Sequence, residues 1–180
     1  SFITSSNFIY SNGYNKYSNS FINSIQLINP YDGKNIDKWV VDTFFFQSED
    51  KLEKTILKFT SIARLHWKKG LEHTLEALAL LKKEGTQFRY TIIGDGAEKE
   101  RLIFAIHQLG LSENVTFTGK LLPQEIKKEL AKTDIYLQYS IQEGFCNAVL
   151  EAQAMGLLSV VSNAEGLNEN VLNNQTGFVV

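Results

Sequence analysis

From residue 55 to the end of the chain, short apolar segments typical of β-strands alternate with amphipathic segments typical of α-helices. Residues 55–63 have the pattern of a strand. Leu71, Leu75 and Leu78 then recur at helical spacing, and Gly85 ends that helix. Such an alternation is typical of βαβ units with right-handed crossovers and parallel strands. The sequence therefore predicts an α/β, Rossmann-like fold, a mostly parallel sheet with helices on both faces.

The same two patterns continue through the rest of the chain. Further strands are expected at 88–93, 115–118, 135–137, 159–162 and 177–180. Further helices are expected around 102–109, from Pro123 onward with Ile126 and Leu130 buried, at 148–155 and at 168–172. Ligands of parallel sheets bind in the loops that follow the carboxyl ends of strands. The loops predicted to carry function are 64–70, 94–97, 119–123, 140–147 and 163–168.

Two glutamates lie on either side of a predicted junction between a loop and a helix. Glu143 falls in the loop, where Gly144 permits a sharp turn. Asn147 is the expected N-cap, Glu151 lies one turn inside the helix, and Gly156 ends it. The first amides of such a helix favour an anion, whereas carboxylates accept hydrogen bonds from hydroxyl groups. This combination fits a nucleotide sugar; the alternative is an amphipathic helix with solvated glutamates.

A basic loop follows the first predicted strand of this sheet. It contains Arg64 and Lys69, whose guanidinium and ammonium groups could converge on a diphosphate. The alternative is an ordinary solvated loop. Lys69 is favoured over its neighbour Lys68 because Lys69 directly precedes Gly70.

Composition and the absence of other motifs exclude several classes of function. A net charge of −2 gives no reason to expect nucleic acid or an anionic membrane as the main partner. The three histidines have no metal-ligand spacing, and Cys146, the single cysteine, is expected to be a packed thiol rather than a nucleophile. Gly94 and Gly96 do not continue into a dinucleotide fingerprint, because Lys99 stands where the third glycine belongs. Neither a metal nor a cofactor is therefore expected.

The stretch from Glu143 through Phe145 to Glu151 resembles the E-x7-E motif of the retaining GT-B glycosyltransferases of family 4. The common form has Pro after the first Glu and Gly after the Phe, where this chain has Gly144 and Cys146. The spacing of Arg64, Lys69 and Gly70 resembles the phosphate-binding loop of that family. The chain also departs from the family pattern at Leu158, which stands in place of a Pro, and in the turn 163–166. Because that turn would lie near the sugar, the identity of the sugar is not predicted.

The resemblance implies a role for each matching residue. Arg64 and Lys69 would hold the diphosphate and stabilise the leaving group, and Glu143 would position the transferred sugar, so these three form the expected catalytic set. Glu151 would bind the ribose. The remaining residues expected to bind the donor come from three loops: Gly94, Gly119, Lys120, Gly144, Phe145, Cys146 and Asn147.

The resemblance also implies a place for this chain within a larger enzyme. Residues 1–50 are expected to be the tail of an N-terminal acceptor domain and the linker, and 51–180 the donor domain, truncated at its C-terminus, in the C-terminal half of a GT-B fold. The whole enzyme would transfer sugar with retention to a saccharide or lipid-linked acceptor in the cytoplasm. Any attachment to the inner face of the membrane would use the missing domain.

Two other functions are compatible with the same residues. One is a GT-B-fold nucleotide-sugar epimerase, and the other is a non-catalytic nucleotide-binding module. The nucleotide base, the sugar, the acceptor and the oligomeric state are left open by the sequence. The fragment alone is expected to be inactive, because sugar transfer needs both domains.

Overall fold

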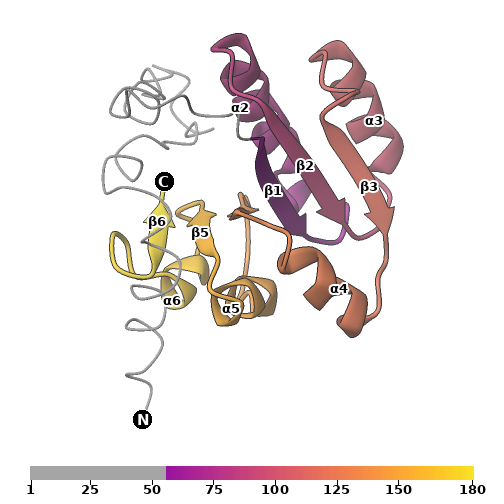
Figure 1. Ribbon diagram of the computed structural model, residues 1–180. Coiled ribbons are helices and arrows are strands. Elements are labelled where there is room, and N and C mark those ends of the chain that lie inside the picture. The colour runs from indigo at the N-terminus through magenta and orange to yellow at the C-terminus, as the bar shows by residue number, and fades with distance from the viewer. Residues whose placement is uncertain (1–55) are drawn as a thin grey trace, which may run out of the picture.

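The computed structural model describes residues 56–180, which form one six-stranded sheet in the order β3-β2-β1-β4-β5-β6 (Figure 1). All five pairs of neighbouring strands are parallel. The predicted α/β, Rossmann-like fold class is therefore confirmed. Residues 1–50, expected to be the tail of an N-terminal domain and the linker, lie outside the described residues.

The elements follow one another in the alternation that the sequence indicated. The strands are β1 (Leu57–Ile62), β2 (Phe88–Ile93), β3 (Val115–Gly119), β4 (Ile135–Gln138), β5 (Leu158–Val161) and β6 (Gly177–Val179). The helices are α2 (Leu71–Lys83), α3 (Lys99–Gln108), α4 (Pro123–Leu130), α5 (Asn147–Ala154) and α6 (Leu167–Asn170). A 3-10 helix, η3 (Trp67–Lys69), was not expected.

The two faces of the sheet carry separate hydrophobic cores. Because side chains alternate along a strand, Ile135 and Leu137 of β4 join a cluster with α2 and α3, while Tyr136 between them joins one with α4, α5 and α6. Figure 1 shows α2 and α3 together near β1–β3, with α4 and α5 at the other side of the sheet. Both faces are thus covered, as expected for a parallel sheet.

The start of α5 differs in detail from the sequence-based expectation. Asn147 was expected to be the N-cap, but it is the first helical residue, and Cys146 occupies the cap position with extended backbone (φ −97°, ψ 96°). The side chain of Cys146 is buried in the second core cluster, which fixes where the chain turns into the helix. Similarly, Leu130 of α4 is buried as expected, whereas Ile126 is only partly buried.

The strand order reverses between β1 and β4. From β1 the chain continues outward through β2 and β3, and from β4 it continues in the opposite direction through β5 and β6. These two central strands pair only at Phe59 with Ile135 and at Thr60 with Tyr136. Closer to their carboxyl ends, the two strands are connected by side chains instead. For example, Ser61 Oγ of β1 donates a hydrogen bond to the Leu137 carbonyl of β4 at 2.6 Å. A crevice at this reversal point is where such sheets bind ligands.

Candidate functional site

A cleft of 1510 Å³ lies at the carboxyl ends of the central strands. Its walls come from the loops that follow β1, β2, β3 and β4 together with the first turn of α5. Ordinary small-molecule pockets span about 300–1,000 Å³, so this cleft is large enough for an extended ligand. Four of the five loops that the sequence singled out therefore meet in one place, although they are scattered along the chain.

The loop after β1 owes its shape to η3 and to Gly70. The Lys68 amide donates to His66 Nδ1 at 3.3 Å, so this histidine caps the short helix. Gly70 has a left-handed backbone (φ 56°), and a Cβ there would lie 2.1 Å from the carbonyl oxygen of Tyr139. Only glycine therefore lets this loop pack against the loop after β4.

Lys69 and Glu143 form an ion pair across the reversal point, with 2.5 Å between Lys69 Nζ and Glu143 Oε2. The two side chains are 23% and 10% exposed, respectively. Backbone contacts hold their loops together, because the carbonyl of Lys68 accepts hydrogen bonds from the amides of Ile141 and Gln142 at 2.8 and 3.3 Å. The fold thus brings together two residues of the expected catalytic set. The third, Arg64, is exposed and lines the same cleft.

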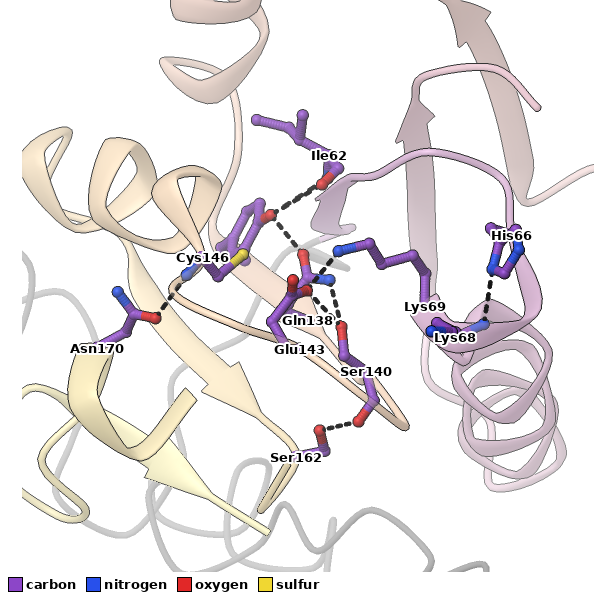
Figure 2. A network of polar contacts seen from close by, with 11 residues as sticks. Ile62, His66, Lys68, Lys69, Gln138, Ser140, Glu143, Cys146, Ser162 and Asn170 are labelled. Carbon is purple, nitrogen blue, oxygen red and sulfur yellow. Dashed lines mark hydrogen bonds and ion pairs between the residues drawn. The ribbon is translucent and has the colours of Figure 1, made fainter. Parts of the chain in front are cut away.

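Behind Glu143 lies a buried polar network that comprises Tyr136, Gln138, Ser140 and Glu143. Figure 2 shows Gln138, Ser140 and Glu143 of this network side by side. The Tyr136 hydroxyl donates to Gln138 Oε1 at 2.8 Å, and Gln138 Nε2 donates to Ser140 Oγ at 2.9 Å. Ser140 Oγ in turn donates to Glu143 Oε2 at 2.9 Å. Sequence reasoning predicted Glu143 but missed Tyr136, Gln138 and Ser140. The available signal was a polar residue at every second position of a strand that is otherwise apolar.

The turn that leads into α5, together with the first residues of that helix, forms the wall beside Glu143. Gly144, Phe145, Cys146 and Asn147 all line the cleft. The amide of Cys146 already donates to Asn170 Oδ1 at 2.9 Å, as Figure 2 shows, so it is not free to meet a ligand. Burial raises the pKa of the Cys146 thiol, which agrees with a packed, protonated side chain.

Close backbone contacts place the loop after β2. Gly94 has φ 140°, and a Cβ on it would lie 1.9 Å from the carbonyl oxygen of Ala63. Its amide donates to the Gly119 carbonyl at 2.8 Å. Gly94 and Lys120 therefore line the cleft, while Gly119 supports Gly94 and does not itself form part of the wall.

Besides Gly119, two parts of the sequence-based site do not line the cleft. Glu151 is exposed on α5, one turn beyond the lining residues. The loop 163–168 supports the site from outside: a Cβ on Gly166 (φ 88°) would lie 2.2 Å from the carbonyl oxygen of Gly144. This glycine therefore sets how closely the loop can approach the turn that follows Glu143.

Metal-ligand clusters and membrane-spanning helices are both absent from residues 56–180. No cluster of three or more His, Cys, Asp or Glu side chains in this part of the chain could hold a metal ion. Nor does it contain a helix that is long and apolar enough to cross a membrane.

Comparisons with known proteins converge on one family. The family model described as glycosyl transferases group 1 matches residues 42–180. The chain is 38% identical over 129 residues to the amylovoran biosynthesis glycosyltransferase AmsK of Erwinia amylovora, covering 68% of this chain and 32% of that protein. It is 35% identical over 136 residues to the putative colanic acid biosynthesis glycosyltransferase WcaL of Escherichia coli K12, covering 72% of this chain and 34% of that protein. The chain thus spans about a third of these relatives.

Two solved structures resemble this chain in fold. The structure of Anabaena Alr3699/HepE in complex with UDP-glucose matches with a TM-score of 0.64 at 26% identity, over 70% of this chain and 35% of that one. The pneumococcal O-GlcNAc transferase GtfA, solved with UDP and GlcNAc, has a TM-score of 0.64 over 69% of this chain and 24% of its own. At 21% identity, this second likeness concerns the fold alone.

Proposed function

The chain belongs to the group 1 glycosyl transferases, and from that premise we propose that it is the donor-binding part of a retaining, family 4-like GT-B enzyme. Its substrate would be a nucleotide-diphosphate sugar. The observation that carries the proposal is the pairing of Lys69 with Glu143 inside the large cleft at the reversal point of the sheet. One residue suits an anion and the other suits hydroxyl groups, which are the two kinds of group that a nucleotide sugar presents.

In this proposal Arg64 and Lys69 bind the diphosphate. A lysine ammonium has three N–H donors. The bond to Glu143 therefore leaves donors of Lys69 for phosphate oxygens. Positive charge beside the bridging oxygen stabilises the nucleoside diphosphate as it leaves, which is the contribution that a metal ion makes in other enzymes. The proposed reaction accordingly needs no metal.

Glu143 would orient the transferred sugar. Its Oε2 is occupied by Lys69 and Ser140, whereas Oε1 has no hydrogen-bond partner among the described residues and can accept from sugar hydroxyls. The amides of Gly144, Phe145 and Asn147 complete this half of the site, without the amide of Cys146, which Asn170 occupies. Glu151 would bind the ribose from further along α5. The UDP-glucose complex of HepE supports a nucleotide sugar as the ligand.

The rest of the proposal concerns the whole enzyme. A first domain would bind a saccharide or lipid-linked acceptor and close over the donor, which excludes water and aligns the reacting groups. The names of AmsK and WcaL support a role in polysaccharide biosynthesis. We place the reaction in the cytoplasm, where the buried free thiol of Cys146 would stay reduced.

Calorimetric titration of the 180-residue chain with UDP, GDP, UDP-glucose and GDP-mannose tests the donor site. Arg64→Ala and Lys69→Ala should each weaken binding of the preferred nucleoside diphosphate about 10- to 100-fold, because a charge-assisted hydrogen bond contributes about 1.5–3 kcal/mol. Lys83→Ala, at the exposed end of α2 and away from the cleft, is the matched control and should bind like the wild type. If both cleft variants also bind like the wild type, the assignment of the phosphate site is wrong.

A further inference from the structure

We propose that Gln138 is a positioning residue for the donor sugar: through Ser140 it fixes the orientation of the Glu143 carboxylate in the cleft. Gln138 lies at the end of β4 and does not line the cleft. Its side chain instead joins two hydrogen bonds of the polar network, one from Tyr136 and one to Ser140. The inference rests on the proposed function in one respect only, namely that Glu143 binds the sugar.

The direction of the hydrogen bonds in this network is set at its inner end. The amide of Ile62, which can only donate, donates to the Tyr136 hydroxyl at 3.3 Å. The hydroxyl proton has two acceptors within reach, the Ile62 carbonyl at 3.4 Å and Gln138 Oε1 at 2.8 Å. It goes to the nearer Gln138 Oε1, and this leaves the Gln138 amide group facing Ser140. Ser140 Oγ accepts from that amide, so its own proton points at Glu143. To continue this sequence of hydrogen bonds, the side chain at position 138 must accept a hydrogen bond from Tyr136 and donate one to Ser140.

Burial prevents the network from rearranging with water. Tyr136, Gln138 and Ser140 are 0%, 2% and 1% exposed, so each broken hydrogen bond would leave a buried polar group unsatisfied. Burial also raises the pKa of the Tyr136 phenol well above its ordinary value, which keeps that group a neutral donor. The backbone at Ser140 is held as well, because Ser162 Oγ donates to its carbonyl at 2.5 Å.

The network fixes the orientation of the Glu143 carboxylate, which is the group proposed to contact the sugar. Two fixed donors, Ser140 Oγ and Lys69 Nζ, both reach Oε2, so the carboxylate cannot rotate freely and Oε1 keeps one direction. Lys69 alone cannot hold that direction, because its flexible stem must also follow the phosphate. Ser140, ordered by Gln138, supplies the rigid contact. Loss of Gln138 should therefore affect recognition of the sugar and leave recognition of the nucleoside diphosphate intact.

The first test compares two affinities in one variant. Gln138→Met keeps the length of the side chain and removes both polar ends. Calorimetry should show UDP affinity within about twofold of wild type, while the advantage of the tightest-binding sugar nucleotide over its free nucleoside diphosphate falls about tenfold. In the Glu143→Ala background, the same substitution should cause no further loss, because Gln138 acts through Glu143.

Thr133→Val is the matched control for a merely structural role. It removes a buried hydrogen bond between Thr60 of β1 and Thr133, which lies just before β4 at the end of the sheet away from the cleft. It should lower stability and leave both affinities unchanged. If Gln138→Met weakens UDP and the sugar nucleotide equally, or if its effect adds fully to that of Glu143→Ala, the positioning role is refuted.

A second variant and a measurement without ligand keep the inference testable if Gln138→Met does not fold. Ser140→Ala cannot overfill the core and should give the same selective loss of sugar recognition. Urea unfolding of Ser140→Ala, Glu143→Ala and the double variant should show a coupling of at least about twofold in the folding equilibrium constant. Failure of the wild-type chain to bind any of the nucleotides would refute the proposed function, whereas additive unfolding effects would refute the network.

Discussion

Replacing Lys69 with methionine should destabilise the protein in a way that a second substitution reverses. In the wild type, Lys69 is the cationic partner of Glu143, whose side chain is only 10% exposed. Lys69→Met keeps the aliphatic stem and removes the charge, so a largely buried carboxylate keeps only the hydroxyl of Ser140. An unpaired charge in such a place is poorly compensated.

The size of the effect follows from the burial of the pair. Exposed ion pairs contribute about 0–1 kcal/mol, whereas breaking a buried pair by removing one partner costs about 3–5 kcal/mol. With side chains 23% and 10% exposed, Lys69 and Glu143 lie between these limits, and we expect a loss of about 2 kcal/mol in the free energy of unfolding. For a urea slope of about 2 kcal/mol/M, the midpoint would fall by about 1 M.

A second substitution, at Glu143, should restore part of the stability that Lys69→Met removes. Adding Glu143→Gln to Lys69→Met removes the second charge and leaves an amide oxygen that can still accept from Ser140. We expect the double variant to regain about 1 kcal/mol or more relative to Lys69→Met alone. The assay is urea unfolding at pH 7, followed by circular dichroism, for the wild type and both variants.

An exposed ion pair elsewhere in the molecule provides the control. Lys132 and Glu129 lie 2.7 Å apart at the end of α4, with side chains 63% and 30% exposed. Lys132→Met should change the free energy of unfolding by no more than about 0.5 kcal/mol. If Lys69→Met behaves like Lys132→Met, or if the double variant is less stable than Lys69→Met, the pair does not hold the two loops as the structure indicates.

Three further predictions concern the same region. Gly70→Ala should cost about 3 kcal/mol or more in urea unfolding, because the new Cβ would meet Tyr139, whereas Gly110→Ala (φ 68°), with nothing within 4 Å, should cost only about 1–2 kcal/mol of backbone strain; equal costs would contradict the loop packing. Glu151→Ala should weaken free UDP and its sugar conjugate alike, and Glu143→Ala mainly the conjugate, in calorimetry; an identical pattern in both variants would refute the separate roles. The 180 residues alone should yield no glycoside detectable by mass spectrometry with nucleotide sugars and simple acceptors, since holding two reactants in place contributes about 7–11 kcal/mol, and efficient transfer would refute the need for a second domain.

The local patterns of the sequence predicted the elements of this fold because their causes are local. Leu71, Leu75 and Leu78 fall on one face of α2 because a helix repeats every 3.6 residues, whatever lies opposite. A glycine follows this helix at Gly85, as the sequence indicated. Even so, the cap of α5 moved from Asn147 to Cys146, since burial of the thiol in the core decides that junction.

The candidate site was only partly accessible to the same reasoning. The spacing of Arg64, Lys69 and Glu143 pointed to one cleft through a resemblance to a family. That Lys69 contacts Glu143 depends on β1 and β4 being neighbours, and many strand orders are compatible with the same series of strands and helices. Two residues 74 positions apart become partners only once that order exists.

Tertiary structure alone decided which polar groups serve the site. The sequence shows that Gln138 alternates with apolar residues of β4, but only the folded sheet buries it between Tyr136 and Ser140. Likewise, the amide of Cys146 looked available to a ligand before α6 placed Asn170 against it. Elements follow from periodicities within about ten residues, whereas hydrogen-bond partners follow from packing, because burial removes water and leaves each polar group only its spatial neighbours.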